Sequence, residues 1–366
     1  MNVTLLNERL GRARDALARI EADWLLVPPS ADFRWLTGAV ARSTERLVAF
    51  ALPREGEPFA VVPRLEAAPL AHECPWLALE IWDEDDNPLE RLLGRVRPTR
   101  STRVLVGEGF RVATLLRLVA GADCRPAAEA IAPLRAVKDA DELAALAEAG
   151  THADRVVEEA ADRARPGMTE RELAFWIAGR FVELGDTDPW AIVASGPNSA
   201  LPHHASSDRR IADDEVLLID CGASTRGYGS DITRTYWLGG APPESLARIH
   251  ALVNEARAAG VAASRAGVPA ESVDAAARAV IARGGHAEHF IHRTGHGVGL
   301  EVHEPPYLVK GNTTPLAAGN VHSVEPGIYL PGRYGVRLED LVVVEAQGAR
   351  RLNAAPLDLR PPARRR

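Results

Sequence analysis

The stretch from His286 to Glu339 constrains this chain more than any other part of its sequence, because histidines and carboxylates alternate there with glycines and strand-like runs. It contains the segments HRTGHGVGLEVHE, SVEPGIYL and YGVRLEDLVVVE. Glycine loses more conformational freedom on folding than other residues, so glycines beside histidines indicate a backbone that turns sharply or approaches another group closely. The pattern predicts that these polar side chains converge, and it indicates a carboxylate-rich metal site.

Two further carboxylates stand at the ends of strand-like runs upstream. The run VLLID ends on Asp220, and Asp231 precedes ITRTYWL, with three glycines in the intervening CGASTRGYGS. A hairpin-like return between the two runs would bring both carboxylates to one end of a sheet. Acids at strand ends commonly cap turns, so this pair alone leaves a structural role open.

Two glutamates repeat this arrangement nearer the C-terminus. Glu325 is followed by Pro326 and Gly327, which interrupt the strand just past the carboxylate. Arg337 and Glu339 are two positions apart in a strand-like run, so their side chains are expected on the same face. A buried structural ion pair is the alternative to a functional site for this arginine and glutamate.

Three histidines lie between these two groups of acids. His292, His296 and His303 follow one another at intervals of four and seven, with Gly295, Gly297 and Gly299 among them. A single histidine in a core is usually a hydrogen-bonded structural residue. Three of them among glycines favour a site, with the backbone folded close to whatever His296 faces.

Convergence of these side chains would require cations. Several carboxylates a few ångströms apart raise one another's pKa strongly unless positive charge neutralises them. A set of carboxylates with one imidazole suits Mn²⁺, Co²⁺ or Zn²⁺. Two divalent ions that share bridging carboxylates activate a water at neutral pH, so the expected reaction is hydrolysis. The five predicted ligands are Asp220, Asp231, His296, Glu325 and Glu339.

Composition excludes several other classes of protein. A net charge of −7 with 25% charged residues argues against a protein that binds nucleic acid or an anionic membrane. No apolar run approaches the roughly 18 residues needed to cross a bilayer. The three cysteines, Cys74, Cys124 and Cys221, form no CxxC pattern, which favours a reducing, cytoplasmic location.

The chain is long enough for two domains, and its pattern of helical and strand-like segments changes near residue 135. A chain of 366 residues is longer than the chains that usually fold around a single hydrophobic core. Strand-like runs alternate with helical patterns over roughly the first 130 residues, which predicts an α/β domain at 1–134. Long helical patterns and glycine-punctuated strands follow, which predicts an α+β domain at 135–366.

Five segments in order resemble one known family. IDCGA, GSDITRTYWLG, HRTGHGVGLEVHEPPY, VEPGIYLPG and GVRLED are similar to the motifs of the proline-specific pita-bread metallopeptidases, the family of prolidase and aminopeptidase P. The resemblance covers about residues 140 to 355. It implies an α/β protein with a smaller creatinase-like N-terminal domain and a C-terminal pita-bread catalytic domain.

The resemblance also implies a role for each ligand in a centre of two divalent metal ions, with Mn²⁺ expected first and Co²⁺ or Zn²⁺ as alternatives. Asp220 would chelate one ion, Asp231 and Glu339 would bridge both, and His296 and Glu325 would hold the second. Glu325 would also carry a proton between the attacking water and the departing nitrogen.

Other residues take their expected roles from the same resemblance. His303 would hydrogen-bond the substrate carbonyl or the tetrahedral intermediate. His203 in ALPHH matches the family's other catalytic histidine, whereas the neighbouring His204 does not. His292 and Arg337 would line the substrate site or support its ligands.

The expected substrates are Xaa-Pro dipeptides or short peptides cleaved after the first residue. A dipeptidase needs a cation for the proline carboxylate, and Arg46 and Arg333 are candidates by charge alone. Xaa-Pro dipeptidase is the favoured activity, aminopeptidase P acting on longer peptides is the main alternative, and a non-catalytic peptide-binding protein is the remote one. The family implies a homodimer.

Overall fold

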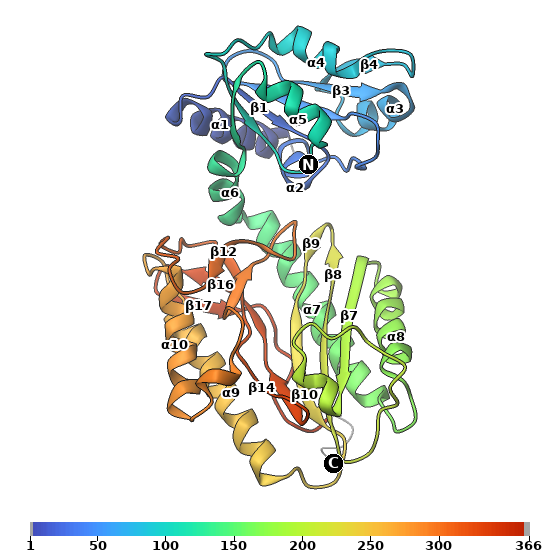
Figure 1. Cartoon of the computed structure of the whole chain (residues 1–366), viewed down its shortest axis with the longest axis vertical. Coiled ribbons are helices and arrows are strands. Elements are labelled where there is room, and N and C mark those ends of the chain that lie inside the picture. The colour runs from blue at the N-terminus through green and yellow to red at the C-terminus, as the bar shows by residue number, and fades with distance from the viewer. Residues whose placement is uncertain (1–2, 362–366) are drawn as a thin grey trace. The chain divides into compact units, whose positions relative to one another are not determined.

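The computed structural model describes residues 3–361, and the chain divides into two compact units, Met1–Arg135 and Ala136–Arg366 (Figure 1). Each unit combines helices with a sheet or sheets, so the predicted α/β class is confirmed. Within residues 3–361, no helix combines the length and the apolar character that crossing a bilayer requires. The three cysteines are free thiols.

The first unit is built on a six-stranded mixed sheet with the order β4-β3-β2-β1-β5-β6. Its central strand β1 runs antiparallel to β2 and parallel to β5. The strands are β1 (Trp24–Val27), β2 (Ala49–Pro53), β3 (Phe59–Pro63), β4 (Ala78–Trp82), β5 (Arg103–Val106) and β6 (Asp123–Pro126). The helices are α1 (Val3–Arg19), α2 (Ala31–Thr37), α3 (Arg64–Glu73), α4 (Pro88–Val96), α5 (Val112–Val119) and α6 (Ala128–Ala136).

Among the described residues the second unit contains three sheets, and the predicted ligands lie on or next to their strands. One has the order β10-β8-β7 with β9 paired to β8, another has the order β12-β11-β13-β16-β17, and β14 and β15 form a hairpin. The first comprises β7 (Thr187–Ser195), β8 (Val216–Thr225), β9 (Tyr228–Gly229) and β10 (Ile232–Trp237). The others comprise β11 (Gly295–Gly297), β12 (Glu304–Leu308), β13 (Val321–Val324), β14 (Gly327–Leu330), β15 (Tyr334–Arg337), β16 (Asp340–Glu345) and β17 (Gly348–Arg351).

Two pairs of helices flank these sheets, α7 and α8 on one side of the unit and α9 and α10 on the other (Figure 1). Val157 of α7 and Phe181 of α8 share a core with Ile219 of β8. Val253 of α9 shares a second core with Val336 of β15. The helical segments are α7 (Ala140–Arg163), α8 (Glu170–Glu183), α9 (Glu244–Ala263) and α10 (Ala270–Arg283), with 3₁₀ turns η1 (Gly196–Ala200) and η2 (Ala287–His289).

Local sequence signals explain where two of these helices begin. Asp139 caps α7, and its side chain accepts a hydrogen bond from the Glu142 amide while Glu142 reaches back to the Asp139 amide. Thr169 and Glu172 make the same reciprocal pair at the start of α8. Each pair satisfies two amides that a helix terminus otherwise leaves without partners.

Candidate metal centre

The five predicted ligands converge in the second unit. The ligand atoms of Asp220, Asp231 and Glu339 lie within 4.8 Å of one another, and so do those of His296, Glu325 and Glu339. Asp220 lies on β8, Asp231 directly precedes β10, and His296 is the middle residue of β11. Glu325 lies between β13 and β14, and Glu339 between β15 and β16. The cluster therefore joins carboxylates from both large sheets.

Backbone pairing holds the two groups of acids at one place. Antiparallel β8 and β10 place Asp220 opposite Thr233, so the return predicted from the glycine-rich turn is present. The Glu339 amide donates to the Thr233 carbonyl at 3.1 Å, and the Glu325 amide donates to the Thr294 carbonyl at 2.8 Å. These bonds tie both glutamates to neighbouring segments.

The His296 imidazole is oriented as a ligand. Its Nδ1 lies 3.1 Å from the Gly297 carbonyl oxygen, which can only accept, so Nδ1 carries the proton. Its Nε2, the nitrogen that is left to ligate a cation, faces carboxylate oxygens of Glu325 at 3.3 Å and Asp231 at 3.6 Å. A backbone acceptor of this kind is the usual device that orients a metal-binding histidine.

Arg337 and Thr233 hold two of the carboxylates. Arg337 Nη2 donates to Asp220 Oδ2 at 2.6 Å, and Arg337 Nε donates to the Thr233 hydroxyl at 3.0 Å. That hydroxyl donates to Glu339 Oε2 at 2.7 Å. One oxygen of Asp220 and one of Glu339 therefore already accept hydrogen bonds from protein side chains.

Tyr329 extends this network to His292. Its hydroxyl accepts from Arg337 Nη1 at 2.9 Å and donates to His292 Nε2 at 2.8 Å, since His292 Nδ1 donates to the Arg293 carbonyl at 2.8 Å. Burial raises the pKa of Tyr329 to about 12 and lowers that of His292. Both groups are therefore neutral hydrogen-bonding partners at neutral pH.

The remaining carboxylate oxygens fit a bound cation. Asp220 Oδ1 and Glu339 Oε1 are buried and have no hydrogen-bond partner among the described residues. Burial, followed by the charge of neighbouring carboxylates, raises the pKa of Asp231 and Glu339 well above the ordinary range. Divalent ions would give these buried oxygens a partner and would neutralise the excess negative charge of the cluster.

Glu325 differs from the other acids. Burial acts to raise its pKa, but the hydrogen bond and charge of His296 outweigh this effect and lower its pKa to about 2. Ser323 Oγ also donates to it at 3.3 Å. Glu325 is therefore the carboxylate of the cluster that is ionised most readily.

A cavity of about 640 Å³ opens over the five side chains. His203, His292, His303 and Arg337 line it, so every residue expected to contact substrate borders the same space. The His303 ring stands edge-on to His296 with 4.0 Å between ring centroids, and burial lowers its pKa to about 4. Arg337 Nη1 reaches the Pro202 carbonyl at 3.3 Å, which fixes the segment that carries His203.

Several singled-out residues lie elsewhere. His204 Nε2 contacts the Glu170 carboxylate at 2.7 Å instead of lining the cavity. Arg333 lies in a different cleft of the second unit, and Arg46 belongs to the first unit, where it pairs with Glu84. Asp340, next to Glu339, is fully buried and accepts hydrogen bonds from Arg234 and Arg257.

The glycines around His296 allow neighbouring strands to approach closely. A Cβ on Gly295 would lie 2.1 Å from the Ser323 carbonyl oxygen, and one on Gly297 would lie 2.3 Å from the Pro305 carbonyl oxygen. Neighbouring strands therefore require glycine at both positions, and the predicted close approach of the backbone to another group is present there as an approach between strands.

Three residues of the site were not identified from the sequence. Thr233 and Tyr329 lie in apolar, strand-like runs where they read as core residues. Arg293 lines the cavity with its guanidinium 4.5 Å from the centre of the Tyr307 ring. Its position beside His292 in HRTGH was the available signal.

Comparison with known proteins identifies the family. Residues 144–346 match Metallopeptidase family M24, and residues 9–137 match the Creatinase/Prolidase N-terminal domain. A protein described as probable dipeptidase PepE of Mycobacterium bovis is 40% identical over 358 residues, which span 96% of this chain and 95% of that protein.

Solved structures agree with this assignment. The crystal structure of dipeptidase PepE from Mycobacterium ulcerans superimposes with a TM-score of 0.93 at 39% identity, covering 98% of both chains. Prolidase from Thermococcus sibiricus gives a TM-score of 0.92 at 35% identity, covering 98% of this chain and 99% of that one. The resemblance seen in the five motifs is confirmed, and the chain belongs to metallopeptidase family M24.

Proposed function

We propose that this metallopeptidase is an Xaa-Pro dipeptidase that uses two divalent metal ions, Mn²⁺ first among them, held by Asp220, Asp231, His296, Glu325 and Glu339. The observation that carries the proposal is the convergence of these side chains in two groups of three that share Glu339, with ligand atoms within 4.8 Å in each group and unpartnered oxygens on Asp220 and Glu339. The proline-specific activity is supported by similarity to proteins named dipeptidase and prolidase. When bound, the ions supply a water activated for attack at neutral pH.

The chain's own residues account for proton transfer and polarisation. Glu325, whose low pKa keeps it ionised, takes the proton from the attacking water and delivers it to the departing prolyl nitrogen. His303 is neutral above about pH 4, so its N–H donates to the oxygen that gains charge as the carbonyl is attacked. His203 lines the same cavity and would contact the proline side of the substrate.

Arg293 supports a dipeptidase over an aminopeptidase. It is the second arginine of the cavity, and among the described residues no carboxylate lies within salt-bridge distance of it, whereas Arg337 is committed to Asp220. A free guanidinium in the substrate cavity is the kind of group that binds a terminal proline carboxylate. A longer peptide would place a neutral amide at that point.

The experiment compares Ala-Pro, Ala-Pro-amide and Ala-Pro-Ala on the Mn²⁺-loaded enzyme. Ala-Pro should be cleaved with the highest kcat/KM. Arg293→Gln should raise the KM for Ala-Pro by roughly 10- to 100-fold, the value of a charge-assisted hydrogen bond, and leave the amide nearly unaffected. Faster cleavage of the tripeptide by the wild type would instead establish the aminopeptidase P alternative.

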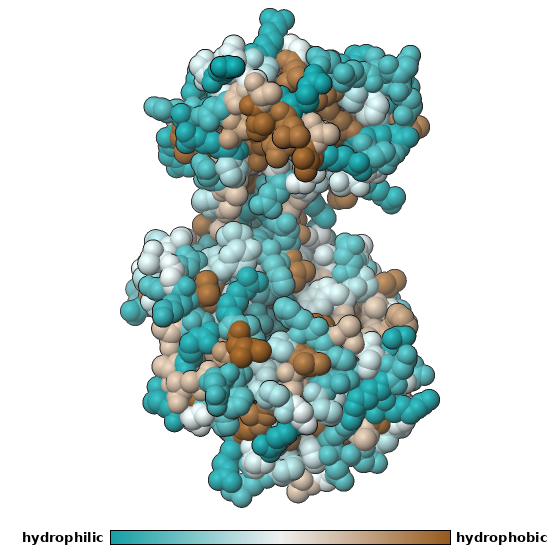
Figure 2. Space-filling model, viewed as in Figure 1, coloured by the Kyte–Doolittle hydropathy of each residue, from teal (hydrophilic) through white to brown (hydrophobic). Residues whose placement is uncertain are grey.

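The proposed assembly is a cytoplasmic homodimer. Figure 2 shows hydrophobic side chains gathered on the first unit over α5, where Val112, Leu116 and Val119 are exposed. Three exposed apolar side chains on one helix face favour an association surface. Light scattering should give the mass of two chains, and Leu116→Glu should shift it toward one; a monomeric wild type would contradict the proposal.

A further inference from the structure

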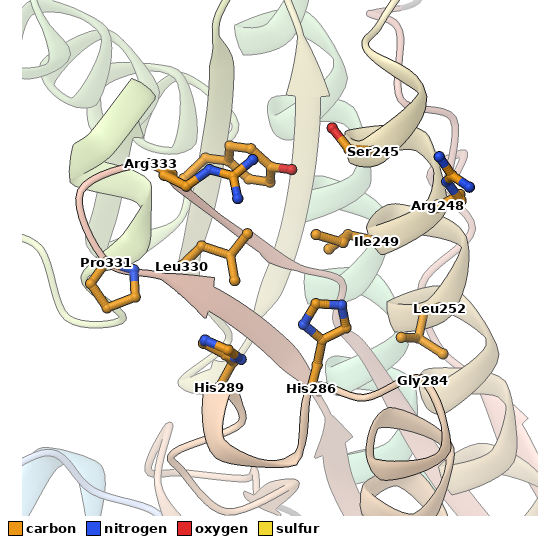
Figure 3. Close-up of a pocket in the computed structure, with 11 residues that line it drawn as sticks. Ser245, Arg248, Ile249, Leu252, Gly284, His286, His289, Leu330, Pro331 and Arg333 are labelled. Atoms are coloured by element: carbon orange, nitrogen blue, oxygen red, sulfur yellow. The ribbon is translucent and has the colours of Figure 1, made fainter.

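A second cleft of the second unit, here named the hairpin cleft, lies among α9, the segment after α10 and the turn between β14 and β15 (Figure 3). Its volume is about 680 Å³, within the range of small-ligand pockets. One face of α9 contributes Ser245, Arg248, Ile249 and Leu252. None of its lining residues borders the metal-centre cavity, so the two spaces are separate.

The charged groups of the hairpin cleft are all basic. Arg248 and Arg333 lie at opposite rims in Figure 3, and no aspartate or glutamate is among the lining residues. Arg333 has no carboxylate within 4.0 Å among residues 3–361, and its guanidinium lies 5.5 Å from the centre of the Tyr334 ring. Arg248 pairs with Glu244 at 3.3 Å, but both side chains are exposed, so that pair is weak. The cleft therefore favours an anion.

Two histidines add hydrogen-bond donors. His286 Nδ1 and His289 Nδ1 are buried and have no partner among the described residues. An imidazole carries at least one N–H in either protonation state, so each of these histidines can donate a hydrogen bond to a bound oxyanion. Figure 3 shows the His286 ring projecting among Ile249, Leu252 and Leu330, so an N–H donor stands in the middle of the cleft.

The floor of the cleft is apolar. Ile249, Leu252 and Leu330 line it, and Gly284 allows Leu252 to approach, since a Cβ on Gly284 would lie 2.2 Å from Leu252 Cδ2. An ammonium group would find no acid among the lining residues. A zwitterionic amino acid or a dipeptide with a free amine is therefore a poor occupant, in contrast to the substrates proposed for the metal centre.

We propose that the hairpin cleft binds a small organic anion in which a carboxylate or a phosphate monoester is carried on an apolar body. The guanidinium of Arg248 or Arg333 and the His286 N–H would meet the oxyanion, and Ile249 and Leu330 would cover the apolar part. Arginine suits both kinds of oxyanion because its planar fork donates two parallel hydrogen bonds.

Calorimetric titration of the metal-loaded full-length protein tests this proposal with 4-phenylbutyrate, phenyl phosphate and the uncharged 4-phenylbutan-1-ol. At least one organic anion should bind with one site per chain, and the alcohol should bind at least about tenfold more weakly. Binding of one anion alone identifies which oxyanion the cleft takes. Saturation by neither anion, or equal binding of the alcohol, would overturn the proposal.

Matched variants locate the bound anion. Arg248→Gln with Arg333→Gln should weaken binding by about tenfold or more, and both positions are exposed, so folding should not suffer. Arg283→Gln, at an exposed arginine of α10 that does not line the cleft, should bind like the wild type. Arg293→Gln should also retain binding; loss there would place the anion in the metal-centre cavity and reject the hairpin cleft.

Discussion

Asp231 is an acid surrounded by other acids in the metal centre. It is buried, its carboxylate faces His296 Nε2 at 3.6 Å, and burial with the charges of Glu339 and Asp220 raises its pKa. An acid in this setting is stable as an anion only when positive charge is close. We therefore expect Asp231 to contribute to the centre through its negative charge, and the shape of its side chain alone should not suffice.

Asp231→Asn keeps the shape and removes that charge. We expect peptidase activity to be abolished and the bound metal per chain to fall, as metal analysis of the purified variant would measure. Asp340→Asn is unsuitable as a control because Asp340 is buried among arginines; Asp141→Asn, at an acid outside the cluster, serves instead. Full activity with undiminished metal would refute the proposed role of Asp231.

His303 provides the complementary case, since its ring stands beside that of His296 and, among the described residues, no hydrogen bond or ion pair joins it to a carboxylate. His303→Ala should lower kcat by about 10²- to 10³-fold, the usual cost of removing one donor to a developing oxyanion. Metal content should remain that of the wild type. A variant that loses its metal would show that His303 is a ligand and not a donor to substrate.

At the scale of elements, the loop that carries His303 depends on a buried ion pair. Lys138 Nζ lies 2.5 Å from Glu304 Oε1, and both side chains are almost fully buried. The Gly229 amide also donates to the Gly299 carbonyl at 2.8 Å. The segment from Gly299 to Glu304 is thus anchored to the start of the second unit and to β9.

Lys138→Met should leave the Glu304 carboxylate buried without its partner and cost about 3–5 kcal/mol of stability. Denaturant unfolding would measure this loss. Adding Glu304→Gln should recover part of the stability, because the buried negative charge that Lys138 offset is then removed. A single variant as stable as the wild type would mean that water or another cation replaces Lys138.

The sequence could predict the ligands but not the groups that hold them. Asp220, Asp231, His296, Glu325 and Glu339 stand at strand ends or among glycines, where ionisable side chains need an explanation. Thr233, Tyr329 and the Lys138–Glu304 pair carry no such signal, because their partners lie far away in the sequence.

One short strand could not be predicted from the sequence for a related reason. Strand β6 has the sequence DCRP, which offers neither an apolar run nor clear alternation, and only pairing with β5 makes it a strand. The longer runs that became β1 to β5, and the capping residues of α7 and α8, were recognisable because local pattern and tertiary packing agree there.

For the whole molecule, the raised pKa values of Asp231 and Glu339 link stability to pH in the metal-free protein. A carboxyl whose pKa is higher in the folded state stabilises the fold fully below its unfolded pKa of about 4, and this stabilisation is lost as pH rises through the folded value. Glu325, with its lowered pKa of about 2, acts oppositely, but its contribution changes only between about pH 2 and pH 4.

The metal-free protein should therefore lose thermal stability as pH rises from about 5 toward 8, and Mn²⁺ should flatten this dependence by neutralising the cluster. Thermal unfolding followed across that range, with and without Mn²⁺, provides the measurement. In Asp231→Asn the metal-free slope should be shallower. A metal-free wild type that gains stability over the same range would contradict the repulsion described for the cluster.

The hairpin of β14 and β15 has one further consequence for the molecule. Gly327 pairs with Arg337 and Leu330 pairs with Tyr334. Glu325 lies just before this hairpin and Glu339 just after it. Sliding one strand by a single position would reverse every side chain it carries. Arg337 would then turn away from Asp220, and the two glutamates would no longer meet, so alignment of this short ribbon is as necessary for catalysis as the acids themselves.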